Sequence, residues 1–209
     1  MPSAKPAASE KEDGGGISPT EDLMREHGIL RRVLLVYQEA MPLITTGDVT
    51  ALRVVAGAAD IVHRFVEGYH ERLEEEFVFP KLEKAGKLVE LTKVLRVQHA
   101  VGRKLTDSIV RAAKVGKAAT TEQRRAVVLG IQAYVRMYAP HAAWEDTELF
   151  PVYRGEFTEA EFDKLGDRFE DQEHKLLGGG GFAGTLKEVS DLEKTLGIHD
   201  LAKFTSASN

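Results

Sequence analysis

The 209-residue chain contains no cysteine, which excludes disulfide bonds, thiolate metal ligands and cysteine nucleophiles. It also lacks any apolar run near the roughly 20 residues of a transmembrane helix, and its N-terminus lacks the apolar centre of a signal peptide. Lysine and arginine form no basic stripe, and the net charge is −5 with neutral histidine, which argues against nucleic-acid binding. We therefore expect a cytoplasmic protein with neither membrane nor nucleic acid as a partner.

The sequence also lacks the apolar–polar alternation of β-strands. Its composition, 43% apolar and 29% charged, is that of a globular protein. Residues 1–17 are small, polar and glycine-rich, so we expect a disordered N-terminal tail there. Residues 18–155 are predicted to form one helical domain, and residues 156–209 a C-terminal helical extension packed on it.

Apolar residues recur with helical spacing along most of the chain. Capping boxes at Ser18 and Thr120 mark two helix starts. Phe79-Pro80 and Phe150-Pro151 are expected to end two helices. The predicted helices span about residues 19–40, 49–84, 88–115, 121–150, 159–177 and 185–196. Their lengths and short connections predict an all-α fold, an antiparallel up-down four-helix bundle with additional C-terminal helices.

An internal repeat stands out within the predicted bundle. Tyr69–Pro80 reads YHERLEEEFVFP and Pro140–Pro151 reads PHAAWEDTELFP. Each copy has a histidine, a glutamate four residues later, a second acidic residue, and then Phe-Pro. Upstream, Glu26–Arg31 resembles Gln98–Arg103 through a shared His-small-x-x-Arg pattern. The chain therefore consists of two helical hairpins that follow one plan.

The repeat supplies four imidazoles and two carboxylates on or beside apolar helix faces. These six residues are His27, His70, Glu74, His99, His141 and Glu145. Buried carboxylates without partners are strongly unfavourable, so such a set favours a cation. Two glutamates that bridge two ions, with histidines completing each ion, would satisfy all six groups. Mixed imidazole and carboxylate ligands suit iron or manganese best, with zinc as a possible substitute.

Simpler interpretations exist for each residue on its own. A lone histidine on an apolar face is usually a hydrogen-bonded core residue, and a single His/Glu pair spaced i, i+4 usually supports a surface helix. The duplicated spacing favours metal binding for the six together. Further candidates for a ligand or a supporting role are His63, Tyr69 and His174. Glu75, Glu76 and Asp146 are expected to be solvated neighbours, with Asp146 as an alternative ligand.

These motifs resemble those of the hemerythrin-like, His-His-Glu cation-binding proteins, over about residues 18–152. The resemblance implies two iron ions, oxo- or hydroxo-bridged, with Glu74 and Glu145 as bridging carboxylates and the four histidines as the remaining ligands. It also implies binding of dioxygen, peroxide or nitric oxide. Oxygen carriers place a second histidine where this chain has Arg103, and they end with His-x4-Asp rather than His141-x3-Glu145. The order of motifs here is more similar to the branch that repairs iron-sulfur clusters under nitrosative stress.

Three functions follow from this resemblance. The first is a non-haem di-iron protein that binds, and in one version reduces, a small oxidant with electrons from an unknown donor. The second is a sensor of oxygen, iron or redox state without turnover, in which the helices after residue 159 move at Gly178–Gly181. The third is an iron donor for cluster repair or a peroxide-removing enzyme. Whether the protein is an enzyme stays open at this stage, as does a purely structural bundle.

Overall fold

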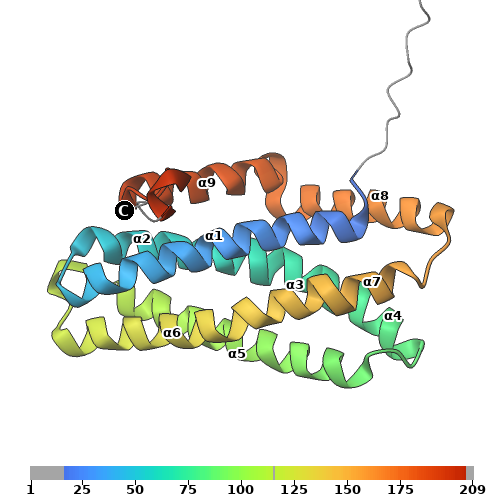
Figure 1. Ribbon diagram of the computed structural model, residues 1–209, viewed down its shortest axis with the longest axis horizontal. Coiled ribbons are helices and arrows are strands. Elements are labelled where there is room, and N and C mark those ends of the chain that lie inside the picture. The colour runs from blue at the N-terminus through green and yellow to red at the C-terminus, as the bar shows by residue number, and fades with distance from the viewer. Residues whose placement is uncertain (1–16, 115, 206–209) are drawn as a thin grey trace, which may run out of the picture.

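The computed structural model describes residues 17–114 and 116–205. Those residues form helices and contain no β-strand, which confirms the prediction of an all-helical protein. The predicted disordered tail falls almost entirely on residues 1–16, outside the described residues. Long helical rods lie side by side along the long axis, and the C-terminal helices lie along one side of them (Figure 1).

The first rod is α1 (Pro19–Thr45). Ser18 caps it as predicted, because its side chain accepts a hydrogen bond from a backbone N–H of the first turn. Pro19 follows at a position where no intrahelical N–H is needed. The helix continues past its predicted end near residue 40, because Ile44 extends the buried face by another turn.

The second rod runs without interruption from Val49 to Lys84 but changes its winding on the way. Asp48 caps its start by accepting hydrogen bonds from the backbone N–H groups of residues 50 and 51, at 2.6 and 3.2 Å. Pro80 does not end this rod, contrary to expectation, because it occupies the first turn of a short helix that needs no N–H there. The rod comprises α2 (Val49–Ile61), π-helical η1 (Val62–His70), α3 (Glu71–Leu73), π-helical η2 (Glu74–Val78) and α4 (Phe79–Lys84).

The second hairpin repeats this plan. Its first rod is α5 (Val89–Ala113), and a short 3-10 turn, η3 (Gly116–Ala118), leads to the next. A full capping box at Thr120 starts α6, as predicted. Pro151 again lies inside a continuing helix, so Phe150-Pro151 also fails to end its rod. This last rod comprises α6 (Thr121–Trp144), π-helical η4 (Glu145–Leu149) and α7 (Phe150–Arg154).

The C-terminal part contains α8 (Glu159–Leu177), a 3-10 turn η5 (Gly178–Gly180), α9 (Gly181–Leu196) and a final turn η6 (Leu201–Phe204). Both α8 and α9 pack against α1, and α9 also packs against α2. Arg32 on α1 donates hydrogen bonds to Glu193 on α9, which fastens this extension to the first rod. The division of the chain at residues 155 and 156 stays a prediction.

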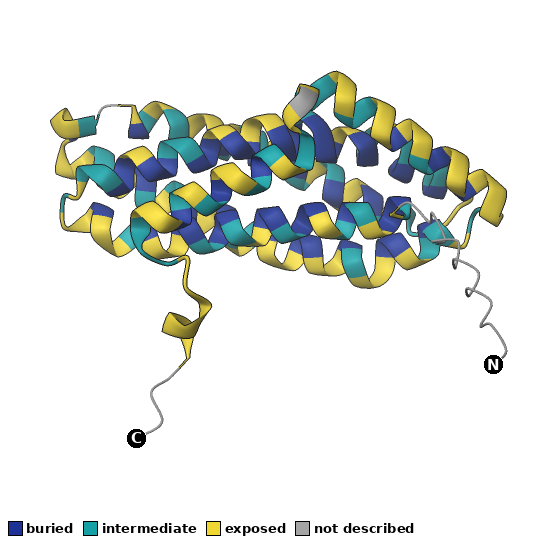
Figure 2. Cartoon of the chain, turned by 90° about the horizontal axis from the view of Figure 1, so that it is seen from above, coloured by how far each residue is buried: buried dark blue, intermediate teal, exposed yellow. Residues whose placement is uncertain are grey.

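The core lies between the rods. Helix α1 contacts α2 and α6, and α5 contacts the same two helices, so each rod touches two neighbours. Buried residues accordingly follow the inward faces of the helices (Figure 2). Within the described ranges, none of the helices has both the length and the apolar character that crossing a membrane would require.

Candidate metal centre

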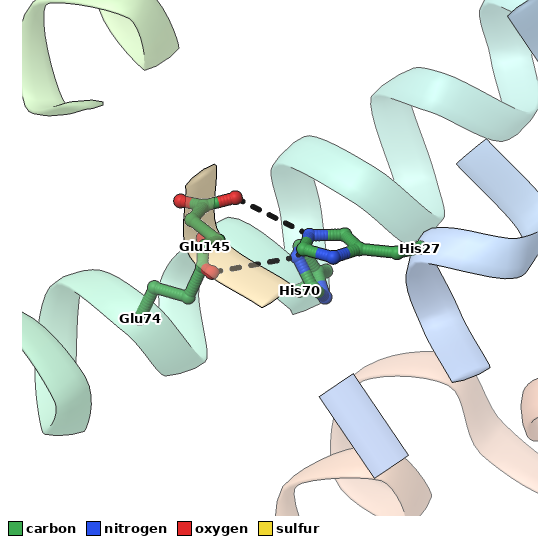
Figure 3. Close-up of side chains that lie close together, drawn as sticks. All are labelled: His27, His70, Glu74 and Glu145. Carbon is green, nitrogen blue, oxygen red and sulfur yellow. Dashed lines mark hydrogen bonds and ion pairs between the residues drawn. The ribbon is translucent and has the colours of Figure 1, made fainter. Parts of the chain in front are cut away.

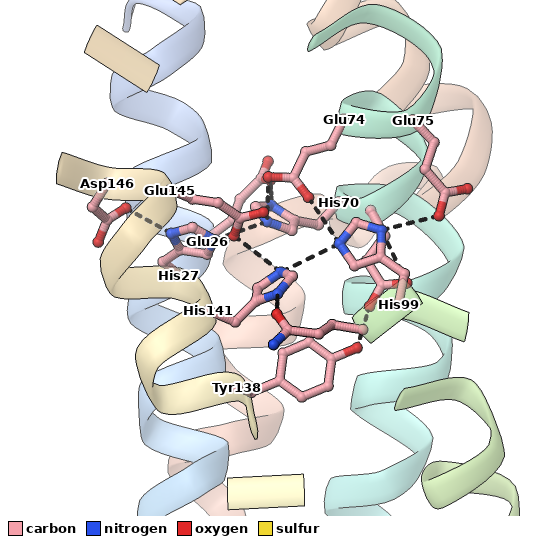
Figure 4. A network of polar contacts seen from close by, with 12 residues as sticks. Glu26, His27, His70, Glu74, Glu75, His99, Tyr138, His141, Glu145 and Asp146 are labelled. Carbon is pink, nitrogen blue, oxygen red and sulfur yellow. Dashed lines mark hydrogen bonds and ion pairs between the residues drawn. The ribbon is translucent and has the colours of Figure 1, made fainter. Parts of the chain in front are cut away.

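The structure brings together all six residues that the repeat singled out. His27 lies on α1, His99 on α5 and His141 on α6. His70 ends η1, while Glu74 and Glu145 begin η2 and η4. Each of the six is between 0% and 4% exposed, and their side chains point toward one another between the rods (Figure 4).

The six residues form two overlapping groups. The first contains His27 and His70, the second contains His99 and His141, and both contain Glu74 and Glu145. Within each group, one nitrogen or oxygen from every residue lies within 4.8 Å of the others. Figure 3 shows the first group, with the two imidazoles facing the two carboxylates. The two groups could hold two cations that would share both glutamates.

Each glutamate faces one histidine of each group. Glu145 Oε2 lies 3.3 Å from His27 Nε2 and 3.1 Å from His141 Nε2. Glu74 Oε1 lies 3.6 Å from His70 Nε2, and Glu74 Oε2 lies 3.4 Å from His99 Nε2. The two glutamates therefore connect the two halves of the cluster.

The winding of the helices contributes to this arrangement. The π-helical segments η1, η2 and η4 lie in the second and fourth rods, at or directly beside the His-x3-Glu motifs. A π-helical turn inserts an extra residue and rotates the following side chains, and such turns are frequent at functional sites. These segments were not predicted, because hydrophobic spacing does not separate α- from π-winding over one or two turns.

The outer nitrogen of every histidine has a hydrogen-bond partner. His27 Nδ1 lies 2.6 Å from Asp146 Oδ1 and His70 Nδ1 lies 2.6 Å from Glu26 Oε2. His99 Nδ1 lies 2.9 Å from Glu75 Oε1, and His141 Nδ1 lies 2.8 Å from Gln98 Oε1. Since a carboxylate or amide oxygen only accepts, Nδ1 is the donor in this arrangement. The Nε2 lone pairs are then directed into the cluster, as a metal ligand requires.

These supporting residues occupy equivalent places in the repeat. Glu26 and Gln98 each precede the first histidine of a hairpin and bind the second histidine of the same hairpin. Glu75 and Asp146 each follow the glutamate of one hairpin and bind the first histidine of the other. The repeat contained all four residues, but sequence reasoning assigned none of them this role.

Glu75 and Asp146 are therefore not the solvated neighbours that we expected. Their side chains are only 26% and 18% exposed. Each also accepts from an arginine, Arg103 for Glu75 at 2.8 Å and Arg31 for Asp146. These arginines occupy the last position of the two His-small-x-x-Arg segments. The repeat therefore encodes two equivalent chains, each of a histidine, an acidic residue and an arginine. Asp146 reaches the cluster through His27 and belongs to neither of the two groups.

The inner atoms of the cluster have few favourable partners without a cation. The Nε2 atoms of His27 and His70 lie 3.1 Å apart, and those of His99 and His141 lie 3.3 Å apart. If all four Nδ1 atoms carry the proton, these contacts set lone pair against lone pair. The carboxylate oxygens of Glu74 and Glu145 are also buried without a hydrogen-bond partner. A cation in each half would relieve both conflicts, so the residues fit a pair of metal ions.

Protonation is strongly perturbed in the metal-free cluster. Burial, and then the neighbouring Glu145, raises the pKa of Glu74 well above its ordinary value. Burial opposes a charge on His27, but Asp146 and Glu145 prevail and raise its pKa to about 9. Burial also disfavours a charge on Glu145, yet His141 and His27 lower its pKa below the usual range. His27 and Glu74 therefore bind protons readily, which reduces the net negative charge of the cluster.

Burial lowers the pKa of the other two perturbed histidines. The pKa of His70 lies well below its ordinary value, through burial and then the neighbouring His27. The pKa of His99 falls to about 4, because burial outweighs the opposing effect of Glu75. Both imidazoles are therefore neutral near pH 7, which leaves them ready to donate a lone pair.

Aromatic rings close the cluster. Phe150 stacks on His27 and Phe79 stacks on His99, each with ring centroids 5.5 Å apart. The two Phe-Pro segments therefore cover imidazoles instead of ending helices. Tyr138 packs against His141 with centroids 5.1 Å apart. These contacts keep water away from the six residues.

The additional candidates lie outside the two groups. His63 is a surface residue whose side chain is 66% exposed, and its Nδ1 pairs with Glu67 at 3.1 Å. His174 is exposed on α8, where it borders a cavity with Asp22 and Glu173. Tyr69 is buried, and its hydroxyl lies beside Glu26 and not among the six residues. The structure therefore offers His63 and His174 no contact with the cluster.

A third group of possible ligands, Glu71, Glu75 and His99, lies beside the second half of the cluster. Arg103 Nη2 already lies 2.8 Å from oxygens of both glutamates. The Tyr138 hydroxyl donates to Glu71 at 2.5 Å. A guanidinium thus supplies the positive charge at this position, and the group is better described as part of the support for His99.

Comparison with known proteins agrees with this geometry. Residues 18–153 match the hemerythrin HHE cation-binding domain. Uncharacterized proteins of Mycobacterium bovis and Mycobacterium tuberculosis are 44% identical to the chain over 189 residues, which cover 90% of this chain and 74% of each relative. No solved structure gives a significant match. The domain match covers most of the chain and contains all six residues of the cluster, so this chain belongs to the hemerythrin HHE cation-binding domain family.

Proposed function

We propose that the chain is a non-haem di-iron protein whose two ions lie in the two halves of the cluster. The observation that carries this proposal is the pair of buried groups that share Glu74 and Glu145. In this proposal the four rods form an antiparallel up-down four-helix bundle, extended by the C-terminal helices, and each contributes ligands. Imidazole and carboxylate donors favour iron, with manganese or zinc as substitutes.

An iron pair would supply a reversible change of redox state and coordination positions for dioxygen, hydrogen peroxide or nitric oxide. The chain's own contribution is to bind and to orient. The acceptors at the four Nδ1 atoms fix the direction of each Nε2 lone pair. Phe79 and Phe150 cover imidazoles and restrict water. Reduction of a bound oxidant would require electrons from a separate donor.

Metal analysis of protein produced with ample iron tests the proposal directly. We expect about two iron ions per chain and an absorption band in the near ultraviolet or visible range that is typical of a ferric pair. Glu74→Ala should lose this iron while retaining its helical circular dichroism. His63→Ala changes a histidine in the same rod outside the cluster and should keep both ions. Iron-reconstituted protein without bound iron would contradict the proposal.

A peroxide-consumption assay then distinguishes an enzyme from a sensor. If the protein turns over peroxide, the wild type and His63→Ala should consume it and Glu74→Ala should not. A sensor would bind iron equally well but show no turnover. Its α8–α9 connection, where Glu173 Oε1 accepts from the backbone N–H of Phe182 at 2.5 Å, would then become more sensitive to proteolysis in one redox state.

A further inference from the structure

One difference between the two halves of the cluster lies at an equivalent position of the repeat. The residue that precedes the first histidine of each hairpin is Glu26 in the first and Gln98 in the second. Each binds Nδ1 of the second histidine of its own hairpin, His70 at 2.6 Å and His141 at 2.8 Å. Glu26, His70 and His141 are labelled in Figure 4. The ligand sets are otherwise alike, so this difference acts directly on one ligand of each half.

A carboxylate and an amide do not fix an imidazole equally well. In its ionised form the Glu26 carboxylate can only accept, so it then holds His70 with the proton on Nδ1 and the lone pair of Nε2 directed inward. The Gln98 amide can accept through its oxygen or donate through its nitrogen after a half-turn. His141 can therefore adopt either tautomer at little cost, and one of the two directs an N–H into the cluster. With Glu26 ionised, the Nε2 lone pair of His70 is directed toward the cation position of the first half. In the second half, the Nε2 lone pair of His141 has this direction in only one of its two tautomers.

The acceptor also changes the strength of the ligand. A hydrogen bond from Nδ1 to a carboxylate makes the opposite nitrogen a better electron donor than a hydrogen bond to a neutral amide does. Both effects favour the same half. A cation between His27 and His70 gains from the better fixed and more basic imidazole of His70.

The other supporting groups do not cancel this difference. The His27–Asp146–Arg31 chain of the first half corresponds to the His99–Glu75–Arg103 chain of the second, so these two contributions are matched. Glu71 adds a further acidic group near the second half. However, its Oε2 lies 4.0 Å from His99 Nδ1, which is too far for a hydrogen bond. Arg103 and the Tyr138 hydroxyl already engage its two oxygens.

We propose that Glu26 and Gln98 make the two cation positions unequal, so that the position at His27 and His70 fills first and holds its ion more tightly. Glu26 and Gln98 are then positioning residues that act through His70 and His141. This inference rests on the proposed pair of ions. It goes further by assigning an order of binding to two ligand sets of the same composition.

Titration of the metal-free protein with Zn²⁺ alone tests the order without redox chemistry. Calorimetry should resolve two binding steps in the wild type. Imidazole nitrogen NMR should show signals of His27 and His70 responding in the first step, and signals of His99 and His141 in the second. Outer-sphere partners typically change metal affinity about 10- to 100-fold, so we expect the steps to differ by roughly tenfold or more.

Substitutions between glutamate and glutamine at residues 26 and 98 should then reverse the difference in metal affinity between the two positions. Gln98→Glu should tighten the weaker step, and Glu26→Gln should weaken the tighter one, so each brings the two steps together. The double exchange Glu26→Gln/Gln98→Glu should restore two steps, with His99 and His141 now responding first. Circular dichroism of each metal-free variant checks folding. If Glu26→Gln fails to fold, Gln98→Glu alone still tests the inference.

Several results would overturn the inference. Simultaneous filling of both positions in the wild type, or filling that starts at His99 and His141, contradicts it. So does an unchanged order in the double exchange. Glu71→Gln tests whether total charge, and not the direct hydrogen bond, sets the order, and an effect as large as that of Gln98→Glu would refute the assignment. Failure of Zn²⁺ to bind at all would instead contradict the proposed metal centre.

Discussion

The half of the cluster around His27 and His70 and the half around His99 and His141 consist of the same residue types but have different surroundings. On the first side, α1 borders a cavity of about 520 Å³ against α8, lined by acidic residues that include Asp22. On the second side, the Tyr138 ring packs directly against His141, and its hydroxyl reaches Glu71. The cavity beside α1 is not lined by any of the six cluster residues, whereas Tyr138 contacts one of them.

This difference indicates which parts of a repeated sequence must stay alike. A ligand set has to meet the geometry of an ion, and both hairpins have a His and a His-x3-Glu motif at nearly the same separation, 43 residues in the first hairpin and 42 in the second. Residues that touch the ligands only from outside have more freedom. The exchange of glutamate for glutamine between residues 26 and 98 is one such change. Helix α8 packs on the first hairpin, against both α1 and η1.

The largest expected effect comes from removing a glutamate that both halves of the cluster share. Glu145→Ala should lose both ions, because Glu145 belongs to both groups of ligands. His70→Ala and His141→Ala each damage one half and should retain about one ion per chain. Metal-to-protein ratios after reconstitution with Fe²⁺, measured without oxygen, provide the comparison. Equal loss in all three variants would show that the halves do not bind independently.

The packed side of the cluster should be sensitive to added volume. A Cβ at Gly102 would lie 2.0 Å from the Tyr138 hydroxyl oxygen, closer than any contact allows. Gly102→Ala should therefore displace Tyr138 from Glu71 and destabilise the metal-free protein by about 1–3 kcal/mol, the usual cost of overpacking. Urea unfolding followed by circular dichroism measures this change. Tyr138→Phe keeps the ring but removes the hydroxyl, so Gly102→Ala/Tyr138→Phe should recover part of the loss.

The sequence was sufficient to single out the six residues, because helical spacing puts His70 and Glu74, or His141 and Glu145, on one face, and the repeat duplicates this pattern. It was also sufficient for the helical class and for the starts at Ser18 and Thr120, whose caps are local. The sequence did not predict the contacts between the two hairpins. Asp146 binds His27, and nothing local in the sequence says that two residues 119 positions apart will touch.

The prediction that Pro80 and Pro151 end helices was wrong for a related reason. Proline is a common stop signal for a helix, but at both positions it lies in the first turn after a π-helical segment. An N–H is not needed in that first turn. The π-helical winding is not visible in the hydrophobic pattern.

The pH dependence of stability should distinguish the metal-free protein from the loaded one. Burial raises the pKa values of Glu26 and Glu71 to about 8 and that of Asp22 to about 7. The pKa of His27 rises to about 9 despite burial, through Asp146 and Glu145. All four groups hold protons more tightly in the folded state than in the unfolded state. Their contribution to stability is therefore lost as pH rises.

We accordingly expect the melting temperature of metal-free protein to fall between about pH 6.5 and 8. Bound Zn²⁺ competes with the protons of the cluster and binds better as pH rises, so the loaded protein should show a smaller fall or a rise. Differential scanning calorimetry at several pH values measures both. A melting temperature that rises over this interval in the metal-free protein would contradict the proton assignments.

The smallest expected effect concerns Gly28, the residue after His27. Its equivalent in the second hairpin, after His99, is Ala100. A Cβ at Gly28 would meet nothing within 4 Å, and glycine inside a helix costs up to about 1 kcal/mol relative to alanine. Gly28→Ala should therefore raise the melting temperature by a few degrees and leave both ions bound. Gly28 and Gly102 each lie within four residues of a cluster histidine. If Gly28→Ala stabilises the protein and Gly102→Ala destabilises it, then the crowding at Tyr138, and not closeness to the cluster, determines the change in stability.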